Sequence, residues 1–146
     1  PVSRFMNEEA VAVDPDFPIE RLVEDYVYKY HYKMFPVARN EELMGCVNTR
    51  DVKSISRDEW EDRTVREIYH KCDEQNSIDA DEDATVALQR MNQTGNSRLI
   101  VTRNGKLAGI LSLKDMLRFL SMKLDLEGDG GLSKSLTRGG LDKPFD

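Results

Sequence analysis

The sequence predicts an α+β fold made of two copies of one unit, each with the order strand, helix, strand, strand, helix. The main observation is a repeat, because GCVNTRD at residues 45–51 has the same pattern as GILSLKD at residues 109–115. The offset is 64 residues at both ends of the pattern (109 − 45 and 115 − 51), and such a fixed offset indicates a duplicated supersecondary unit. The flanking residues also align without gaps, since RNEELMGCVNTRDV at 39–52 lies over RNGKLAGILSLKDM at 103–116.

The first unit has one pattern for each predicted element. AVAVDPD at residues 10–16 alternates and then reaches Asp-Pro, which predicts a short strand followed by a turn. Apolar residues recur at helical spacing from Pro18 to Tyr30, and a proline suits a first helical turn because its missing N–H needs no partner there. MFPVA at 34–38 and LMGCVN at 43–48 flank a polar turn and predict a hairpin, and helical character resumes over residues 49–55.

The second unit repeats this order after a polar connector at residues 56–63. Its predicted elements are a lead-in helix at 64–71, a short strand at 76–79, a helix at 81–91, a hairpin of 98–102 and 106–112, and a closing helix at 113–124. The Asn104-Gly105 turn is a strong hairpin signal. The first helices of the two units correspond at an offset of 65, so the first unit carries one extra residue, which we expect at the end of its helix.

These patterns divide the chain into a first unit at residues 1–57, a second unit with its lead-in helix at 58–126, and a tail at 127–146. The tail is rich in glycine and polar residues and has no periodicity, which predicts a flexible terminus.

Composition argues against several functions. Charged residues make up 33% of the 146 and the net charge is −6, so a nucleic-acid binder, which needs a broad basic field, is not expected. No apolar run could span a bilayer, which favours a soluble cytoplasmic domain, and the start at Pro1 indicates a fragment. Cys46 and Cys72 fall at non-equivalent positions, and His31 and His70 lack ligand spacing, so no disulfide framework, metal site or catalytic residue is predicted.

Two tandem units of this order, each ending its second strand with Gly-x-x-(Asn/Ser)-x-x-Asp, resemble cystathionine-β-synthase-type (CBS) domains, and the pair resembles a Bateman module. The resemblance covers about residues 2–124. It implies that the units pack through their sheets about a pseudo-twofold axis. It also implies a regulatory, non-catalytic role, with clefts that bind adenosine derivatives such as AMP, ADP, ATP or S-adenosylmethionine.

The resemblance implies that Ser112 hydrogen-bonds a phosphate or the ribose, and that Asp115 accepts from the ribose hydroxyls. The first-unit counterparts are Asn48 and Asp51; Asn48 departs from the usual Thr or Ser, so Thr49 is an alternative donor. This chemistry is reasonable, because one carboxylate accepts both hydroxyls of a ribose diol while a helix N-terminus donates N–H groups to phosphate. The other candidates are Val11, Val13 and Ile78 for an adenine slot, and Lys33, Arg39, Arg50, Arg98, Arg103 and Lys114 for the phosphates.

The same motifs have a structural alternative. Asn48-x-x-Asp51 and Ser112-x-x-Asp115 are also helix starts, in which the first side chain caps the helix and the aspartate suits its dipole. Capping and ligand binding can use the same atoms at different times.

The tyrosine-rich segment YVYKYHYKMF at residues 26–35 also has two interpretations. Its aromatic residues favour either a protein contact or a helix with Tyr26 and Tyr30 inward and Tyr28 and Tyr32 on the surface.

The N-terminal region, from PVSRFM to RLVEDYVYKYHYKMFPV, also resembles the CBS pairs that follow the membrane part of site-2-protease-like zinc metalloproteases. The first functional hypothesis is therefore a sensory module that binds an adenine nucleotide, forms a homodimer through its CBS pair, and controls an attached membrane effector. The alternative is a ligand-independent oligomerisation module whose clefts stay empty.

Overall fold

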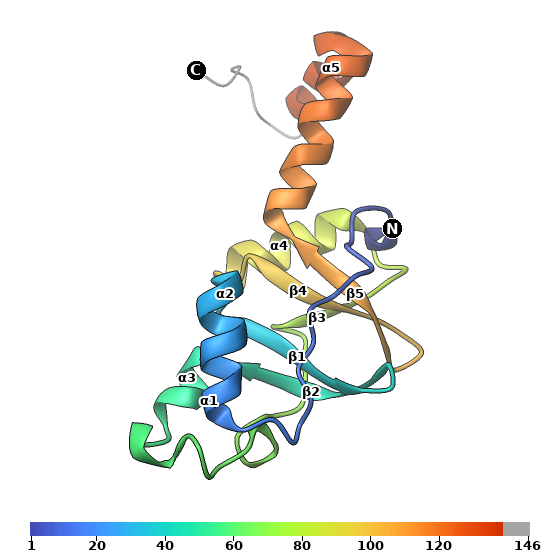
Figure 1. Cartoon of the computed structure of the whole chain (residues 1–146). Helices are drawn as coiled ribbons and strands as arrows, with labels where there is room; N and C mark the ends of the chain where they lie inside the picture. Colours follow the sequence, from blue (N-terminus) through green and yellow to red (C-terminus); the bar gives the residue numbers. More distant parts are fainter. Residues whose placement is uncertain (139–146) are drawn as a thin grey trace.

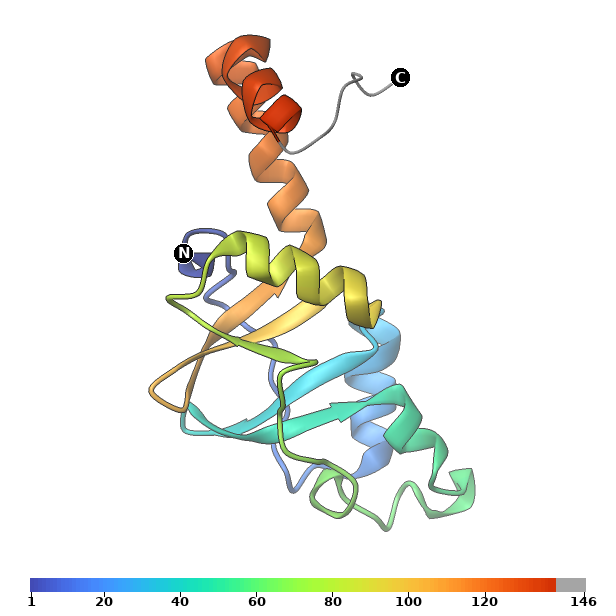
Figure 2. The same cartoon turned by 180° about the vertical axis from the view of Figure 1, so that it is seen from behind.

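The structure of the protein is a computed structural model that describes residues 1–138. Figures 1 and 2 show one five-stranded sheet, in the order β1-β2-β5-β4-β3, with helices packed against it and α5 projecting away from it. The strands are β1 (Met34–Arg39), β2 (Glu42–Asn48), β3 (Ser77–Asp79), β4 (Arg98–Arg103) and β5 (Lys106–Ser112). The predicted α+β class and the two repeated units are confirmed, while the division of the chain at residue 57 stays a prediction.

Both predicted hairpins are present and have matching irregularities. The register of each hairpin shifts at one point, and the two points are 64 residues apart, at Val37/Ala38 and at Val101/Thr102. Each turn has two residues of positive φ, as a two-residue hairpin turn of type I′ requires. These are Asn40 and Glu41 in the first unit and Asn104 and Gly105 in the second. The hairpins join where Glu42 of β2 pairs with Lys106 of β5.

The strand predicted at residues 10–16 is reduced to a single parallel bridge between Val13 and Val37. Pro36 explains the loss, because the next bond of a parallel ladder would run from its missing N–H to the carbonyl of Val11. In the second unit the corresponding residue is Ile100, whose N–H donates to the Asn76 carbonyl at 2.8 Å. There the three-residue strand β3 forms.

The first long helix contains the extra residue that the repeat predicts, but inside the helix and not at its end. It runs through α1 (Ile19–Leu22), a π-helical turn (Val23–Val27) and α2 (Tyr28–Tyr30), whereas its counterpart α4 (Ala84–Thr94) is α-helical throughout. A π turn accommodates one inserted residue without breaking a helix. The helices therefore start 65 residues apart, while their left-handed C-terminal residues, His31 and Gly95, are 64 apart.

Three other predicted segments differ from the structure. Helix α3 is short, at Thr49–Lys53, and the lead-in helix at 64–71 is reduced to one 3₁₀ turn, Val65–Glu67, because the chain then extends to pair with β2. Helix α5 runs from Leu113 to Arg138 with a non-helical break at Gly128, so the backbone of the predicted flexible tail is largely helical as far as residue 138. Residues 139–146 lie outside the described residues.

The segments that precede the units are exchanged between them. Val2, at the start of the first unit, is buried in the core of the second unit, and Val65, which precedes the second unit, is buried in the core of the first. A third, smaller cluster of Cys46, Ile100 and Ile110 lies between the hairpins. The two units are therefore joined by the sheet and also by a segment from each that is buried in the core of the other.

Candidate ligand-binding cleft

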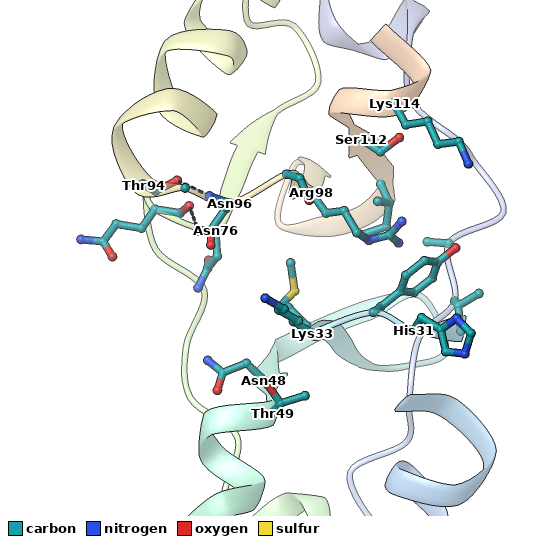
Figure 3. A pocket seen from close by; sticks show the side chains of 18 of the residues that line it. His31, Lys33, Asn48, Thr49, Asn76, Thr94, Asn96, Arg98, Ser112 and Lys114 are labelled. Atoms are coloured by element: carbon teal, nitrogen blue, oxygen red, sulfur yellow. Dashed lines mark hydrogen bonds between the residues drawn. The ribbon is translucent and has the colours of Figure 1, made fainter. Parts of the chain in front are cut away.

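A cleft of about 1210 Å³ lies where the two hairpins are furthest from their turns. It is lined by the starts of β1 and β4, the ends of β2 and β5, and the first residues of α3 and α5 (Figure 3). Both repeated motifs face this one cleft. The sequence candidates among its lining residues are Val11, Lys33, Asn48, Thr49, Arg50, Asp51, Arg98, Ser112, Lys114 and Asp115.

Four sequence candidates lie elsewhere. Val13 and Ile78 are buried in the cores of the first and second units, so they do not line an adenine slot in this cleft. Val11, two residues before Val13 on the same segment, does line it. Arg39 and Arg103 end β1 and β4 at the turns, away from the cleft, and Arg39 instead binds Asp14 and Asp16.

In the second-unit motif, the Asp115 carboxylate faces the cleft and makes few interactions with other side chains. Ser112 caps helix α5, because the Asp115 backbone N–H donates to its Oγ at 3.1 Å. Within residues 1–138, the contact recorded for the Asp115 carboxylate is a loose ion pair, 3.7 Å from Oδ1 to Arg118 Nη1. Both Asp115 oxygens therefore remain accessible to hydroxyl donors.

In the first-unit motif, Asn48 and Asp51 hydrogen-bond to each other. Asn48 Oδ1 accepts from the Asp51 N–H at 2.9 Å, and Asp51 Oδ2 accepts from the Asn48 N–H at 2.9 Å, which is a complete capping box. His70 Nε2 lies 3.1 Å from the same Asp51 oxygen. The structural interpretation of the motif thus describes the first unit, and the capping in the second unit involves only the serine.

Arg98 connects the two units across the cleft. Its guanidinium lies over the ring of Tyr32, 3.5 Å from the centroid, in a cation–π contact. Burial lowers its pKa from the ordinary arginine value, and its buried Nε has no hydrogen-bond partner within residues 1–138. Arg98 is therefore an incompletely satisfied cation that faces a cleft, which suits it to an anionic ligand.

The charges that line the cleft are nearly balanced, although the chain as a whole is acidic. Five lining residues are lysine or arginine and four are aspartate or glutamate, while the whole chain has a net charge of −6. The basic residues are Lys33, Arg50, Arg98, Lys114 and Arg118, and the acidic ones are Glu9, Asp51, Asp73 and Asp115. The cleft therefore brings five cationic side chains together in an acidic protein, and an anionic ligand requires such cations nearby.

Three cleft residues, Tyr32, His70 and Asn76, are not indicated by the sequence motifs. Tyr26 and Tyr30 pack on the first-unit core and Tyr28 is exposed, as one interpretation predicted, but Tyr32 is half-buried beneath Arg98 and not on the outer surface. The lead-in segments carry a weak repeat of their own at an offset of 63, which pairs Val2 with Val65 and Asn7 with His70. That repeat could have shown where His70 would lie.

Two cleft residues, His70 and Asn76, contact the Cys46 thiol, which does not itself line the cleft. Asn76 Nδ2 donates to Cys46 Sγ at 3.1 Å, and His70 Nδ1 lies 3.7 Å from the same sulfur. The neighbouring Cys72 thiol and burial raise the pKa of the Cys46 thiol, whereas the proximity of Cys46 lowers the pKa of Cys72. Cys46 is buried as a core residue, as its apolar neighbours predict. Within residues 1–138 no group of three or more potential metal ligands is found.

Comparison with known proteins identifies the fold and the family. Residues 2–58 and 65–122 match the CBS domain family. A zinc metalloprotease of Methanocaldococcus jannaschii is 32% identical over 118 residues, which are 81% of this chain and 31% of that protein. The chain thus spans less than a third of this relative's length.

Two solved structures share the fold. The CBS domain of a bacterial CNNM/CorC-family Mg²⁺ transporter, in complex with ATP, has a TM-score of 0.63 and 24% identity over 80% of this chain and 84% of that one. A Vibrio cholerae protein described as an acetoin utilization protein has a TM-score of 0.72 and 17% identity over 88% and 96%. CBS domains are in general regulatory and non-catalytic. Because the family matches cover both repeated units, the chain belongs to the CBS domain family and carries a tandem pair of these domains.

Proposed function

We propose that the cleft binds an adenine nucleotide or S-adenosylmethionine, and that binding regulates an effector attached to this domain. The observation that carries the proposal is the arrangement around Asp115, where an accessible carboxylate and the start of α5 lie beside Arg98 and Lys114 in one cleft. A ribose diol can donate to the carboxylate while phosphate oxygens accept from the helix N–H groups and the cations. The Mg²⁺-transporter CBS domain bound to ATP supports this ligand class.

The adenine base requires apolar contacts in the same cleft. Val11, Met34 and Ile110 line it together with the ring of Tyr32. Val11, Tyr32 and Met34 belong to the first unit and Ile110 to the second, so a bound base would contact both units at once. A ligand that contacts both units can favour one arrangement of them over another, which regulation requires.

The effector is proposed to be a membrane zinc metalloprotease, with the CBS pair on the cytoplasmic side. The similarity to the metalloprotease of Methanocaldococcus jannaschii supports this assignment, since this chain aligns with 31% of that protein. In the part of the chain that the structure describes, no helix is both long and apolar enough to cross a membrane. The membrane part would therefore be supplied by other segments of a longer protein.

A second candidate function is ligand-independent assembly through α5. Most of the large apolar side chains exposed in the described residues are on this helix: Leu117, Phe119, Leu120, Met122, Leu124 and Leu126. Such a concentration is typical of a protein contact. Homodimerisation through the CBS pair is compatible with either function.

Thermal unfolding of the chain with AMP, ADP, ATP and S-adenosylmethionine tests the proposal. A ligand at a hundred times its dissociation constant should stabilise the fold by about 2.7 kcal/mol, which raises Tm by several degrees. Asp115→Asn should reduce the shift by at least about half. The control is Asp125→Asn, which makes the same change at an exposed position of the same helix outside the cleft and should leave the shift unchanged. If none of the four compounds raises Tm and the chain still assembles in a concentration-dependent manner, the assembly function replaces this one.

A further inference from the structure

We infer that His70 occupies the first-unit half of the cleft and restricts the chain to one bound nucleotide, held in the second-unit half. The inference rests on the proposed nucleotide binding and deepens it. It follows from the contacts of the His70 imidazole, from the backbone that positions it, and from a comparison with its counterpart in the other unit.

The imidazole contacts the polar groups that a first-unit ligand would use. His70 Nε2 lies 3.1 Å from Asp51 Oδ2 and 3.5 Å from Asn48 Nδ2. The same Asp51 oxygen accepts the Asn48 N–H at 2.9 Å. A ribose diol needs a carboxylate that can accept from two hydroxyls, so the imidazole must leave Asp51 before a nucleotide can bind there.

The backbone holds His70 in this position. Its N–H and C=O both bond to Cys46 of β2, with N···O distances of 3.0 and 2.8 Å. A Cβ atom on Gly45 would lie 2.3 Å from the His70 carbonyl oxygen, so the strand accepts this close approach only because residue 45 is a glycine. The placement of His70 is therefore a property of the fold.

Asn7 is the counterpart of His70 and leaves Asp115 accessible. Its backbone pairs with Ile110 of β5 in the same way, with N···O distances of 2.8 and 3.0 Å, and it approaches Gly109 as His70 approaches Gly45. The Asn7 side chain, however, accepts from the Glu9 N–H at 2.9 Å. Two equivalent backbone positions thus carry one side chain that covers its aspartate and one that does not.

Calorimetric titration of the 146-residue chain with ATP and with AMP tests the inference through stoichiometry. The unaltered chain should bind one nucleotide, and His70→Asn, which copies the second-unit arrangement, should bind two. Asp51→Asn in the His70→Asn background should weaken binding at the added site at least about 10-fold, and Asp115→Asn should weaken binding at the original one by a similar factor. The reciprocal change Asn7→His should weaken binding to the original site at least several-fold.

The outcomes separate the inference from the proposed function. One nucleotide bound by both the unaltered chain and His70→Asn, or two by the unaltered chain, would overturn the role of His70 and leave nucleotide binding intact. Binding to His70→Asn but not to the unaltered chain would support the role of His70 and contradict binding at Asp115. No binding by any variant would overturn both. His70 is on the surface, and thermal unfolding of His70→Asn without ligand checks that the variant is folded.

Discussion

At three backbone positions the second unit has a residue that suits the local geometry and the first unit has one that suits it less well. Two of these positions have a positive φ angle, and the third needs a backbone N–H donor. His31 and Glu41 have φ angles of 61° and 70°, whereas their counterparts Gly95 and Gly105 have 75° and 76°. Pro36, which has no N–H, takes the place of Ile100, whose N–H donates to the Asn76 carbonyl next to β3. The comparison shows that one backbone can be maintained with different local strain. It also shows that the strained unit is the one whose aspartate is covered.

The largest change in stability is expected at Gly45 and Gly109, where the exchanged segments pass close to the strands at His70 and Asn7. A methyl group on residue 45 would lie 2.3 Å from the His70 carbonyl oxygen, and one on residue 109 would lie 2.6 Å from that of Asn7. Gly45→Ala and Gly109→Ala should each destabilise the fold by roughly 1–3 kcal/mol, as overpacked sites do, with the larger loss at Gly45. Urea unfolding measures both. Equal stability of Gly45→Ala and the unaltered chain would show that the crossing segment can move away.

The next effect concerns the two aspartates. Asp115→Asn should weaken nucleotide binding about 10- to 100-fold, because a hydrogen bond to a charged group contributes roughly 1.5–3 kcal/mol. Asp51→Asn should change affinity by less than about twofold if its site is covered. Its effect should instead appear in stability, at up to about 1 kcal/mol, because a neutral amide oxygen accepts the Asn48 N–H less strongly than a carboxylate and no longer suits the helix dipole. Calorimetry and urea unfolding of both variants give the two comparisons, and a larger affinity loss for Asp51→Asn would reverse the assignment of the sites.

Substitutions at the residues with positive φ should change stability by smaller amounts, with opposite signs in the two units. His31→Gly and Glu41→Gly should each stabilise the first unit by about 1 kcal/mol, because a residue with a Cβ is strained at positive φ. Gly95→Ala and Gly105→Ala should each destabilise the second unit by a similar amount, since a Cβ at either position meets open space and only the backbone strain is added. Destabilisation by Glu41→Gly would show that its side chain makes contacts worth more than the strain.

The smallest effect is the acid sensitivity of the first unit. Hydrogen bonds from Arg66 and Arg39 lower the pKa of Asp16 from 3.8 to about 2. A lowered pKa in the folded state stabilises the fold above pH 3.8, and this contribution is lost as the pH falls towards 2. Asp16→Asn should therefore reduce Tm at pH 5 and not at pH 2. The reduction should be small because the ion pairs of Asp16 with Arg39 and Arg66 are exposed and screened by salt. Asp81→Asn, at the corresponding position of the second unit, is the control.

The sequence predicted the repeated elements well because the hairpins depend on short-range patterns. The Asn-containing turns, the apolar runs and the 64-residue offset all lie within a few residues of what they specify, and both hairpins form as expected. The two repeated motifs also lie at the ends of β2 and β5, as predicted, while their ligand role stays a prediction. These features need no knowledge of contacts between distant segments.

The failures depend on long-range contacts. Whether residues 10–16 form a strand was decided by Pro36 on the partner strand, and whether 64–71 form a helix was decided by pairing of His70 with Cys46. Val13 and Ile78 are buried in the cores and do not line the cleft. Alternation alone does not show which side of a segment faces a cleft, and their predicted ligand contact stays a prediction. The contact of Tyr32 with Arg98 joins different units and leaves no local pattern.

The join between the hairpins has a mechanical consequence. In the described residues, β2 and β5 pair at Glu42 and Lys106, next to the turns, whereas the cleft lies at the opposite ends of the strands. Strands of this length extend about 20 Å, so a rotation of about 5° at the joined ends would move the far ends by about 2 Å. The separation of the two hairpins at the cleft is therefore sensitive to small rotations about their joined ends. Because α5 continues from the end of β5 at the cleft, a bound nucleotide that changed this separation would also change the orientation of the helix.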